Sequence, residues 1–359
     1  MSAGLPDFRS LVLDVYASLE GGTHGILNDI PPGACNNWLA ATTGLDSQQC
    51  AEVNRFIRGD YDVVLGMLER RMDGSAAPTN KVRSTVCEIL RRGGIHPAPI
   101  HNALIRLADR GIALTIVTTN FDLLLEAAAR RQRKRIQTYA LGGIPRPGRS
   151  DDFAGVLHIH GALNKAPDRT SDMIVTDQDF GEFYLRRRVI PDFIYDAARL
   201  FHLVLVGYSA NDAPMRYLLN AVAADGSRFD DLKERFAFVG MESSPNAIEI
   251  EDWKGRGITP IPYSSAGKHA ALTNTLLRWS ELSAINGNPK RIDAELKRLV
   301  RTPRSTATEA DRDLFDHLIR RSATNERNRM AALVSKAGAG IEWLEAIAAV
   351  GREPKRGAP

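Results

Sequence analysis

The sequence lacks several features that would each assign a protein to a class. Its three cysteines, Cys35, Cys50 and Cys87, stand far apart with no paired spacing, which argues against a disulfide framework and against a zinc ribbon. No apolar run approaches the ~20 residues needed to span a bilayer. The N-terminus also has no basic segment followed by an apolar one. We therefore expect a cytoplasmic protein without structural zinc.

Charge and aromatic residues are distributed in a way that argues against a nucleic-acid groove. The formal net charge of +4 comes from the C-terminal end, because 15 Lys and Arg accompany 10 Asp and Glu from Gly287 onward, against 32 and 33 before it. Aromatic residues make up 7% of the chain and do not alternate with basic ones in its body. Direct nucleic-acid binding is therefore not expected.

The first 285 residues alternate between strand and helix patterns. Three buried-looking strands each stop at a polar cluster, and shorter strands are expected over 173–175, 235–240 and 258–263. The three strands with polar ends are Ile112–Asp122 (IALTIVTTNFD), Gly155–Gly161 (GVLHIHG) and His202–Asp212 (HLVLVGYSAND). This alternation predicts an α/β fold: a Rossmann-like three-layer α/β/α sandwich with a mostly parallel sheet, in which the strand ending at TTNFD is covered on both faces.

Two regions read as helical additions to this sandwich. Amphipathic patterns over 60–72 and 82–90 predict a helical insertion at about 21–99 within a domain of residues 1–285. Residues 286–359 read as a helical C-terminal extension that is rich in charge. Its basic helices have two open interpretations, an interface for assembly or a solvated cap.

The polar residues at the strand ends are the candidate site. In an open parallel sheet, ligands bind beyond the carboxyl ends of the strands, which makes Thr118, Thr119, Asn120 and Asp122 candidates. The alternative is a connecting loop in which Asn120 or Asp122 caps the helix that starts near Leu123. The segment alone favours neither interpretation.

The second strand adds two histidines. His158 and His160 alternate along it, so the pattern predicts that they share a face, where they could begin a metal site. No third ligand stands at a recognisable spacing. His160, next to Gly161 at the strand end, is the better candidate for acid–base work because imidazole titrates near neutral pH.

Four motifs in order, GLPDFRS, TTNFD, HIHG and GYSAND, resemble the sirtuin superfamily from Met1 to about Leu282. The chain looks most like the bacterial sirtuin-like (SIR2-like) branch, whose members hydrolyse NAD and commonly act in antiphage defence. The resemblance implies that Asn120 contacts the nicotinamide ribose and is needed for cleavage. It implies that His160 is the base, and that Asp122 lines the nicotinamide pocket or holds its loop.

The same resemblance implies a cofactor-binding set. Gly207 and Ser209 match the turn that receives the phosphates and ribose, and Asp212 fixes that turn. The N-terminal loop contributes further contacts to the cofactor. The complete expected set is Gly4, Asp7, Phe8, Arg9, Thr119, Asp122, Gly161, Gly207, Ser209 and Asp212.

Two departures from the family pattern shape the expected function. The family's first strand and its G-A-G-x-S phosphate loop would precede Ser2, so we expect either that the given start lies too far downstream or that this form has lost part of its dinucleotide cradle. Two C-x-x-C pairs, the zinc ribbon of protein-deacylating sirtuins, have no counterpart, so zinc is not expected.

The resemblance therefore implies an enzyme that uses NAD as substrate and releases nicotinamide and ADP-ribose. The alternatives are a catalytically weak NAD- or ADP-ribose-binding module of a larger complex, and an NAD-dependent protein deacylase. Expected partners are copies of the chain, a defence protein of the ATPase, nuclease or Argonaute type, or both.

Overall fold

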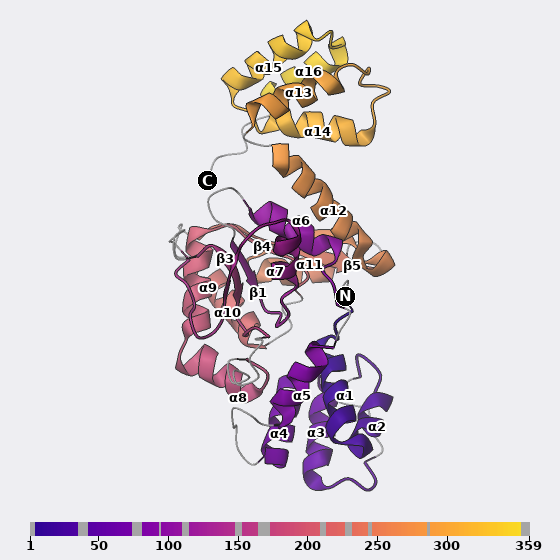
Figure 1. Cartoon of the computed structure of the whole chain (residues 1–359), viewed down its shortest axis with the longest axis vertical. Helices are drawn as coiled ribbons and strands as arrows, with labels where there is room; N and C mark the ends of the chain where they lie inside the picture. The colour runs from indigo at the N-terminus through magenta and orange to yellow at the C-terminus, as the bar shows by residue number, and fades with distance from the viewer. Residues whose placement is uncertain are drawn as a thin grey trace. The chain divides into compact units, whose positions relative to one another are not determined.

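The computed structural model describes residues 4–34, 42–73, 81–92, 95–109, 115–147, 153–163, 173–208, 213–226, 232–242, 246–285 and 288–352. The chain divides into two compact units, Met1–Thr275 and Leu276–Pro359 (Figure 1). The division falls within helix α12 (Ala266–Ile285). No helix in the described ranges is long and apolar enough to cross a membrane.

The first unit begins with a group of helices that share one core. These are α1 (Phe8–Leu19), α2 (Gly21–Asp29), α3 (Ser47–Ile57), α4 (Tyr61–Asp73) and α5 (Lys81–Leu90), seen together in Figure 1. Asp7 and Asp46 accept backbone N–H groups at the starts of α1 and α3, which fixes where these helices begin. Apolar side chains such as Val12, Phe56 and Leu65 fill the core between the helices.

A partly buried ionic cluster connects helices of this group. Arg71 on α4 forms bidentate hydrogen bonds with both Glu20 and Glu52, and Glu52 also accepts the hydroxyl of Tyr16. Burial and the neighbouring carboxylate Glu52 raise the pKa of Tyr16, so its hydroxyl stays protonated as a donor. The cluster ties α1, α3 and α4 together.

Two parallel sheets follow the helical group. The first has the order β1 (Thr115–Thr118), β3 (Gly155–His158), β2 (Gln137–Tyr139), and β3 is buried at all four positions. Helices α6 (Pro99–Ala108) and α7 (Leu124–Arg131) pack on β3, with Ile105, Ala128 and Val156 in one cluster. Strands β2 and β3 are parallel, and Thr138 of β2 lies opposite Val156 of β3.

The second sheet has the order β4 (Leu203–Leu205), β5 (Arg235–Met241), β6 (Thr259–Ser264). The helical elements that accompany it along the chain are α8 (Asp177–Phe180), the π-helix η2 (Gly181–Arg186), α9 (Val189–Leu200), α10 (Ala213–Gly226) and α11 (Ala247–Gly255). One apolar cluster contains Leu157 of β3 together with Phe193 of α9 and Val239 of β5. Both sheets therefore contribute to a common core.

The predicted fold class is confirmed, with corrections to individual strands. All described strand pairs are parallel and alternate with helices, but they form two three-stranded sheets. The strand ending at TTNFD was expected to be covered on both faces. Instead β1 is an end strand of its described sheet, with Val117 42% exposed, and Val204 of β4 is 41% exposed. An apolar run does not reveal which strand of a sheet is central.

Two further expectations are wrong in detail. Residues 173–175 were predicted as a short strand, but they form a buried segment without regular secondary structure that pairs with no strand in the part of the chain described. The strand expected to run through His160 ends at His158, so strict alternation does not extend to His160. Thr176 caps the helix α8 that follows this segment, and α8 continues into the π-helical turn η2.

The described part of the second unit is helical. It contains α13 (Pro289–Leu299), α14 (Glu309–Arg320), α15 (Thr324–Lys336) and α16 (Ile341–Arg352), grouped in Figure 1. Trp343 lies in its core, 4.5 Å from Phe315 between ring centroids. The Arg304 guanidinium lies over the Trp343 ring and is paired with Asp316.

Gly155 at the start of β3 gives a test of the sheet. A Cβ at this position would lie 1.9 Å from the backbone oxygen of Gln137, so Gly155→Ala must push β2 away from β3. We expect the free energy of unfolding to fall by about 1–3 kcal/mol, the usual cost of overpacking. Gly142→Ala is the matched control, because its Cβ would meet nothing within 4 Å. Urea denaturation measures the free energy of unfolding of both variants. Equal values would contradict the close approach of position 155 to the backbone of Gln137.

Candidate functional site

The TTNFD and HIHG segments lie side by side at the carboxyl ends of β1 and β3. Thr118 is the register partner of His158, so the two strands end at the same level. Beyond them, the amide of Ile159 donates to the carbonyl of Thr118 at 3.0 Å, and the amide of Leu163 donates to the carbonyl of Phe121 at 2.7 Å. The structure thus brings the two motifs together, as their strand-end placement predicted.

The TTNFD loop is ordered by its own side chains. The Thr118 hydroxyl accepts the amide of Asn120 at 3.1 Å, and Asp122 accepts the amide of Leu124 at 3.0 Å as α7 begins. The N-cap of α7 is Leu123, so Asp122 bonds the start of the helix from the position before the cap and does not itself cap it. Asn120 is exposed, and its side chain makes no hydrogen bond within the described ranges.

His158 is fully buried and bonds through both ring nitrogens. Nδ1 donates to the carbonyl of Asn120 at 2.7 Å, and Nε2 lies 2.9 Å from the carboxylate of Glu126 on α7. Burial by itself would lower the pKa of His158. The hydrogen bond and charge of Glu126, the carbonyl of Asn120 and the charge of Asp122 outweigh burial, so the pKa lies above its ordinary value. The pair therefore favours the imidazolium form of His158.

His160 has the opposite environment. Its Nε2 lies 2.8 Å from the hydroxyl of Tyr184, and the Phe180 ring meets it edge-on at 5.5 Å. The side chain is buried without a charged partner, which lowers the pKa of His160 to about 4. The imidazole is therefore neutral at pH 7. His158 contacts α7 whereas His160 contacts η2, so the two rings do not form the shared metal site considered from their alternation.

The backbone of His160 is held by a segment further along the chain, residues 173–179. The amide of Ile174 donates to the His160 carbonyl at 2.8 Å. Asp179 at the start of α8 accepts the amides of Val175 and Thr176, each at 2.9 Å. The position of His160 therefore depends on how residues 173–179 are anchored.

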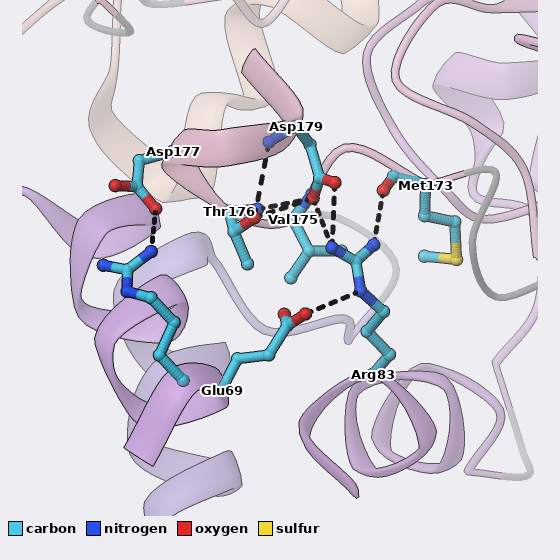
Figure 2. A network of polar contacts seen from close by, with 8 residues as sticks. Glu69, Arg83, Met173, Val175, Thr176, Asp177 and Asp179 are labelled. Carbon is cyan, nitrogen blue, oxygen red and sulfur yellow. Dashed lines mark hydrogen bonds and ion pairs between the residues drawn. The ribbon is translucent and has the colours of Figure 1, made fainter. Parts of the chain in front are cut away.

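Arg83 on α5 provides this anchor (Figure 2). Its guanidinium bonds both oxygens of Asp179 at 2.8 Å and the carbonyl of Met173 at 3.0 Å, and it pairs with Glu69 at 3.4 Å. Burial opposes its charge, but Asp179 and Glu69 raise the pKa of Arg83, so it stays protonated. Arg70 and Asp177 add a more exposed pair at 3.3 Å. The helical group thus fixes the segment that supports His160.

The predicted N-terminal cofactor loop lies in the helical group. Gly4 has φ +81°, and Asp7 accepts the amide of Ser10 as the cap of α1. The Phe8 and Tyr61 rings are 6.2 Å apart between centroids, and the Arg9 guanidinium lies over Phe56. A cavity of about 170 Å³ lies beside this loop. It is lined by Arg9, Ile30, Pro31, Gly33, Ala34, Phe56, Ile57, Arg58, Gly59 and Tyr61.

The remaining predicted cofactor residues lie in different places. Thr119 is half-buried within the TTNFD loop, and Gly161 turns the chain after His160 with φ +96°. Gly207 follows β4 in the second sheet with φ +65° and is exposed. Ser209 and Asp212 lie outside the described residues. The structure therefore joins the TTNFD and HIHG candidates in one place, while Arg9 and Gly207 belong to other elements.

Sequence reasoning missed the partners of the two histidines. Glu126 lies on α7 and Tyr184 on η2, where a carboxylate and a phenol normally indicate a solvated face and core packing. The signal available for Glu126 was its place among apolar neighbours on α7, since Leu125, Glu126 and Ala128 are all buried. No group of three or more His, Cys, Asp or Glu residues able to hold a metal occurs among the residues whose placement is described.

The anchor through Arg83 gives a stability prediction. Arg83→Met leaves the half-buried carboxylate of Asp179 without its buried cation, so we expect the free energy of unfolding to fall by about 3–5 kcal/mol. Arg92→Met is the control, because Arg92 and Asp14 form an exposed pair at 3.8 Å, and such a pair contributes about 0–1 kcal/mol. Chemical denaturation compares them. Similar losses in both variants would show that the Arg83–Asp179 pair contributes no more to stability than an exposed pair.

The charged state of His158 predicts a pH dependence. Because its pKa is raised in the folded protein, the stabilisation is fully present below the ordinary value of about 6.5 and is lost as pH rises through the raised pKa. The stability difference between wild type and His158→Asn should therefore shrink from about pH 6 to pH 9. Denaturation at several pH values measures it. A difference that grows with pH would mean that His158 is neutral when folded.

Part of the chain is similar to known proteins. Residues 114–261 match the model of a family described as the SIR2-like domain. An uncharacterized Sinorhizobium fredii protein, y4cA, is 30% identical over 341 residues, covering 88% of this chain and 25% of the relative. The chain thus spans about a quarter of that relative's length. The region that carries both sheets and the joined TTNFD and HIHG loops is similar to a SIR2-like domain.

Proposed function

We propose that this protein is an NAD⁺ glycohydrolase that cleaves the bond between nicotinamide and ribose to give nicotinamide and ADP-ribose. The observation that carries the proposal is the meeting of the TTNFD and HIHG loops, within the residues that match a SIR2-like domain. This meeting brings together the loop of Asn120, whose amide is exposed, and the loop of His160, whose imidazole is neutral.

The reaction needs an orienting group more than a strong acid. As the glycosidic bond breaks, its electron pair leaves with nicotinamide, which departs neutral, and positive charge develops on the ribose. A water oxygen then bonds to the sugar carbon and releases a proton. The Asn120 amide can donate to or accept from a ribose hydroxyl or the attacking water, which makes it the orienting group.

His160 is suited to receiving a proton at Nδ1. In the tautomer in which Nε2–H donates to the Tyr184 hydroxyl, Nδ1 is left as an acceptor, and it has no hydrogen-bond partner among the described residues. A pKa of about 4 keeps the ring unprotonated at neutral pH but also makes it a weak base. General base catalysis by His160 would therefore contribute toward the lower end of the usual 10²- to 10⁴-fold range.

Hydrolysis is favoured over protein deacylation. The chain has three cysteines, so it cannot form two C-x-x-C pairs. The resemblance implies that these pairs hold the zinc module of the protein-deacylating members. A deacylase would consume NAD strictly in the presence of an acylated peptide, so NAD cleavage without peptide separates the two activities.

A second candidate, a module that binds NAD or ADP-ribose without cleaving it, is favoured by a specific observation. His160 is 7% exposed, and a cavity of about 170 Å³ lies at Arg9 and Tyr61. Arg9 and Arg58 could attract the phosphates of a dinucleotide to that cavity. Calorimetric binding without turnover would support this candidate.

We extend the proposal to an NAD-depleting role in bacterial antiphage defence, in an oligomer or with a partner protein. Its support is the resemblance of the four motifs to sirtuin-like effectors, and the charged helices α13–α16 are the surface we assign to assembly. A fall in cellular NAD during phage infection, in cells that express the protein, is the measure of this role.

The proposed chemistry predicts the effect of two substitutions. Asn120→Ala and His160→Ala should each lower the rate of nicotinamide and ADP-ribose release by at least about 10²-fold, because one removes the orienting amide and the other the proton acceptor. Chromatography of products from purified protein incubated with NAD measures the rate.

The controls are Asn54→Ala and His96→Ala, which replace exposed residues of the same types on other elements. Both should keep the wild-type rate. Full activity in Asn120→Ala and His160→Ala would refute the site, whereas an inactive wild-type protein that binds NAD would favour the binding module.

A further inference from the structure

A buried side-chain bridge connects the TTNFD loop to helix α7. Its centre is His158, the last residue of β3, which is 0% exposed. One ring nitrogen contacts the carbonyl of Asn120 at 2.7 Å, and the other contacts the carboxylate of Glu126 at 2.9 Å. The bridge therefore ends on the backbone of Asn120, the residue that we propose orients the attacking water or the ribose.

The chemistry of the two acceptors fixes the protonation of the ring. A carbonyl oxygen accepts and cannot donate, so Nδ1 carries a proton. The same Glu126 oxygen, Oε1, also accepts the hydroxyl of Thr138 at 3.0 Å, while Oε2 is buried without a hydrogen-bond partner in the described structure. The buried carboxylate of Glu126 thus favours the imidazolium form of His158. Both ends of the bridge are charge-assisted hydrogen bonds, which are short and directional.

The bridge acts on a loop with few other restraints at Asn120. The amide of Asn120 is bonded by Thr118 of the same loop, and the neighbouring carbonyl of Phe121 accepts the amide of Leu163. Among the described residues, His158 is the one side chain from outside the loop that hydrogen-bonds the Asn120 peptide. The orientation of that peptide sets the direction in which the Asn120 side chain leaves the backbone.

We propose that His158 is a positioning residue for Asn120: it holds the Asn120 carbonyl so that the side-chain amide is presented in one direction at the carboxyl end of β1. The kinetic consequence rests on the proposed NAD cleavage, whereas the structural consequence, an ordered TTNFD loop, does not. Glu126 contributes by keeping the imidazole charged and by fixing its far end to α7.

Two substitutions of His158 separate positioning from a general contribution to stability. The amide nitrogen of asparagine occupies the place of Nδ1, so His158→Asn keeps a donor for the Asn120 carbonyl and loses the bond to Glu126. The amide of glutamine reaches the place of Nε2, so His158→Gln keeps the bond to Glu126 and loses the donor to Asn120. Both variants remove the positive charge and leave a buried amide, which makes them matched.

The experiment measures kcat and KM for NAD in the wild type and both variants, below the unfolding temperature of each. His158→Gln should lose about 10²-fold in kcat with KM changed by less than about threefold, since misplacement of an orienting group costs rate. His158→Asn should keep kcat within about tenfold of wild type. In parallel, hydrogen exchange of peptides covering residues 115–125 should be faster in His158→Gln than in His158→Asn.

Each result has one meaning. Equal losses of kcat in the two variants, or wild-type kcat in both, would overturn the positioning role. If the wild type does not cleave NAD, the proposed function fails and hydrogen exchange of residues 115–125 alone decides the positioning role. Faster exchange in His158→Gln than in His158→Asn upholds that role, and equal exchange overturns it. If His158→Gln does not fold, ¹⁵N chemical shifts of wild-type His158 decide, with a protonated Nδ1 upholding the bond to Asn120 and an unprotonated Nδ1 overturning it.

Discussion

The parallel register between β1 and β3 is the constraint on which the candidate site depends. Thr118 pairs with His158, so both chains leave the sheet at the same level, and the next backbone hydrogen bonds already join one loop to the other. A shift of one residue would turn His158 to the other face of the strand. His158 would then lose its hydrogen bonds to Glu126 on α7 and to the carbonyl of Asn120.

Two buried ionic contacts hold this strand end from different elements. The His158–Glu126 pair fixes the TTNFD loop, and the Arg83–Asp179 pair fixes the segment that bonds the backbone of His160. Buried pairs add little net stability because desolvation offsets their attraction, but a charge left unpaired is costly. Such pairs therefore disfavour alternative arrangements of the loops more than they stabilise the fold as a whole.

Charge separates the roles of two histidines that stand two positions apart. His158 lies beside a carboxylate and carries a charge, whereas His160 lies among Tyr184 and Phe180 and is neutral. The charged ring is bound at both nitrogens and is suited to holding a loop. The neutral ring keeps one nitrogen without a partner in the described structure and is suited to accepting a proton.

The sequence by itself determined the α/β class, the order of strands and helices, and the loops that follow the strands, because hydrophobic periodicity and helix-starting residues such as Asp7 and Thr176 act locally. It also identified TTNFD and HIHG as neighbours, since parallel strands end at one edge. Only the tertiary structure decided that β3 and not β1 is the buried centre of its sheet, and that Glu126 and Tyr184 are the partners of the histidines. Which strand is flanked on both sides, and which helix faces a given ring, depends on contacts between residues distant in sequence, and local patterns do not encode those contacts.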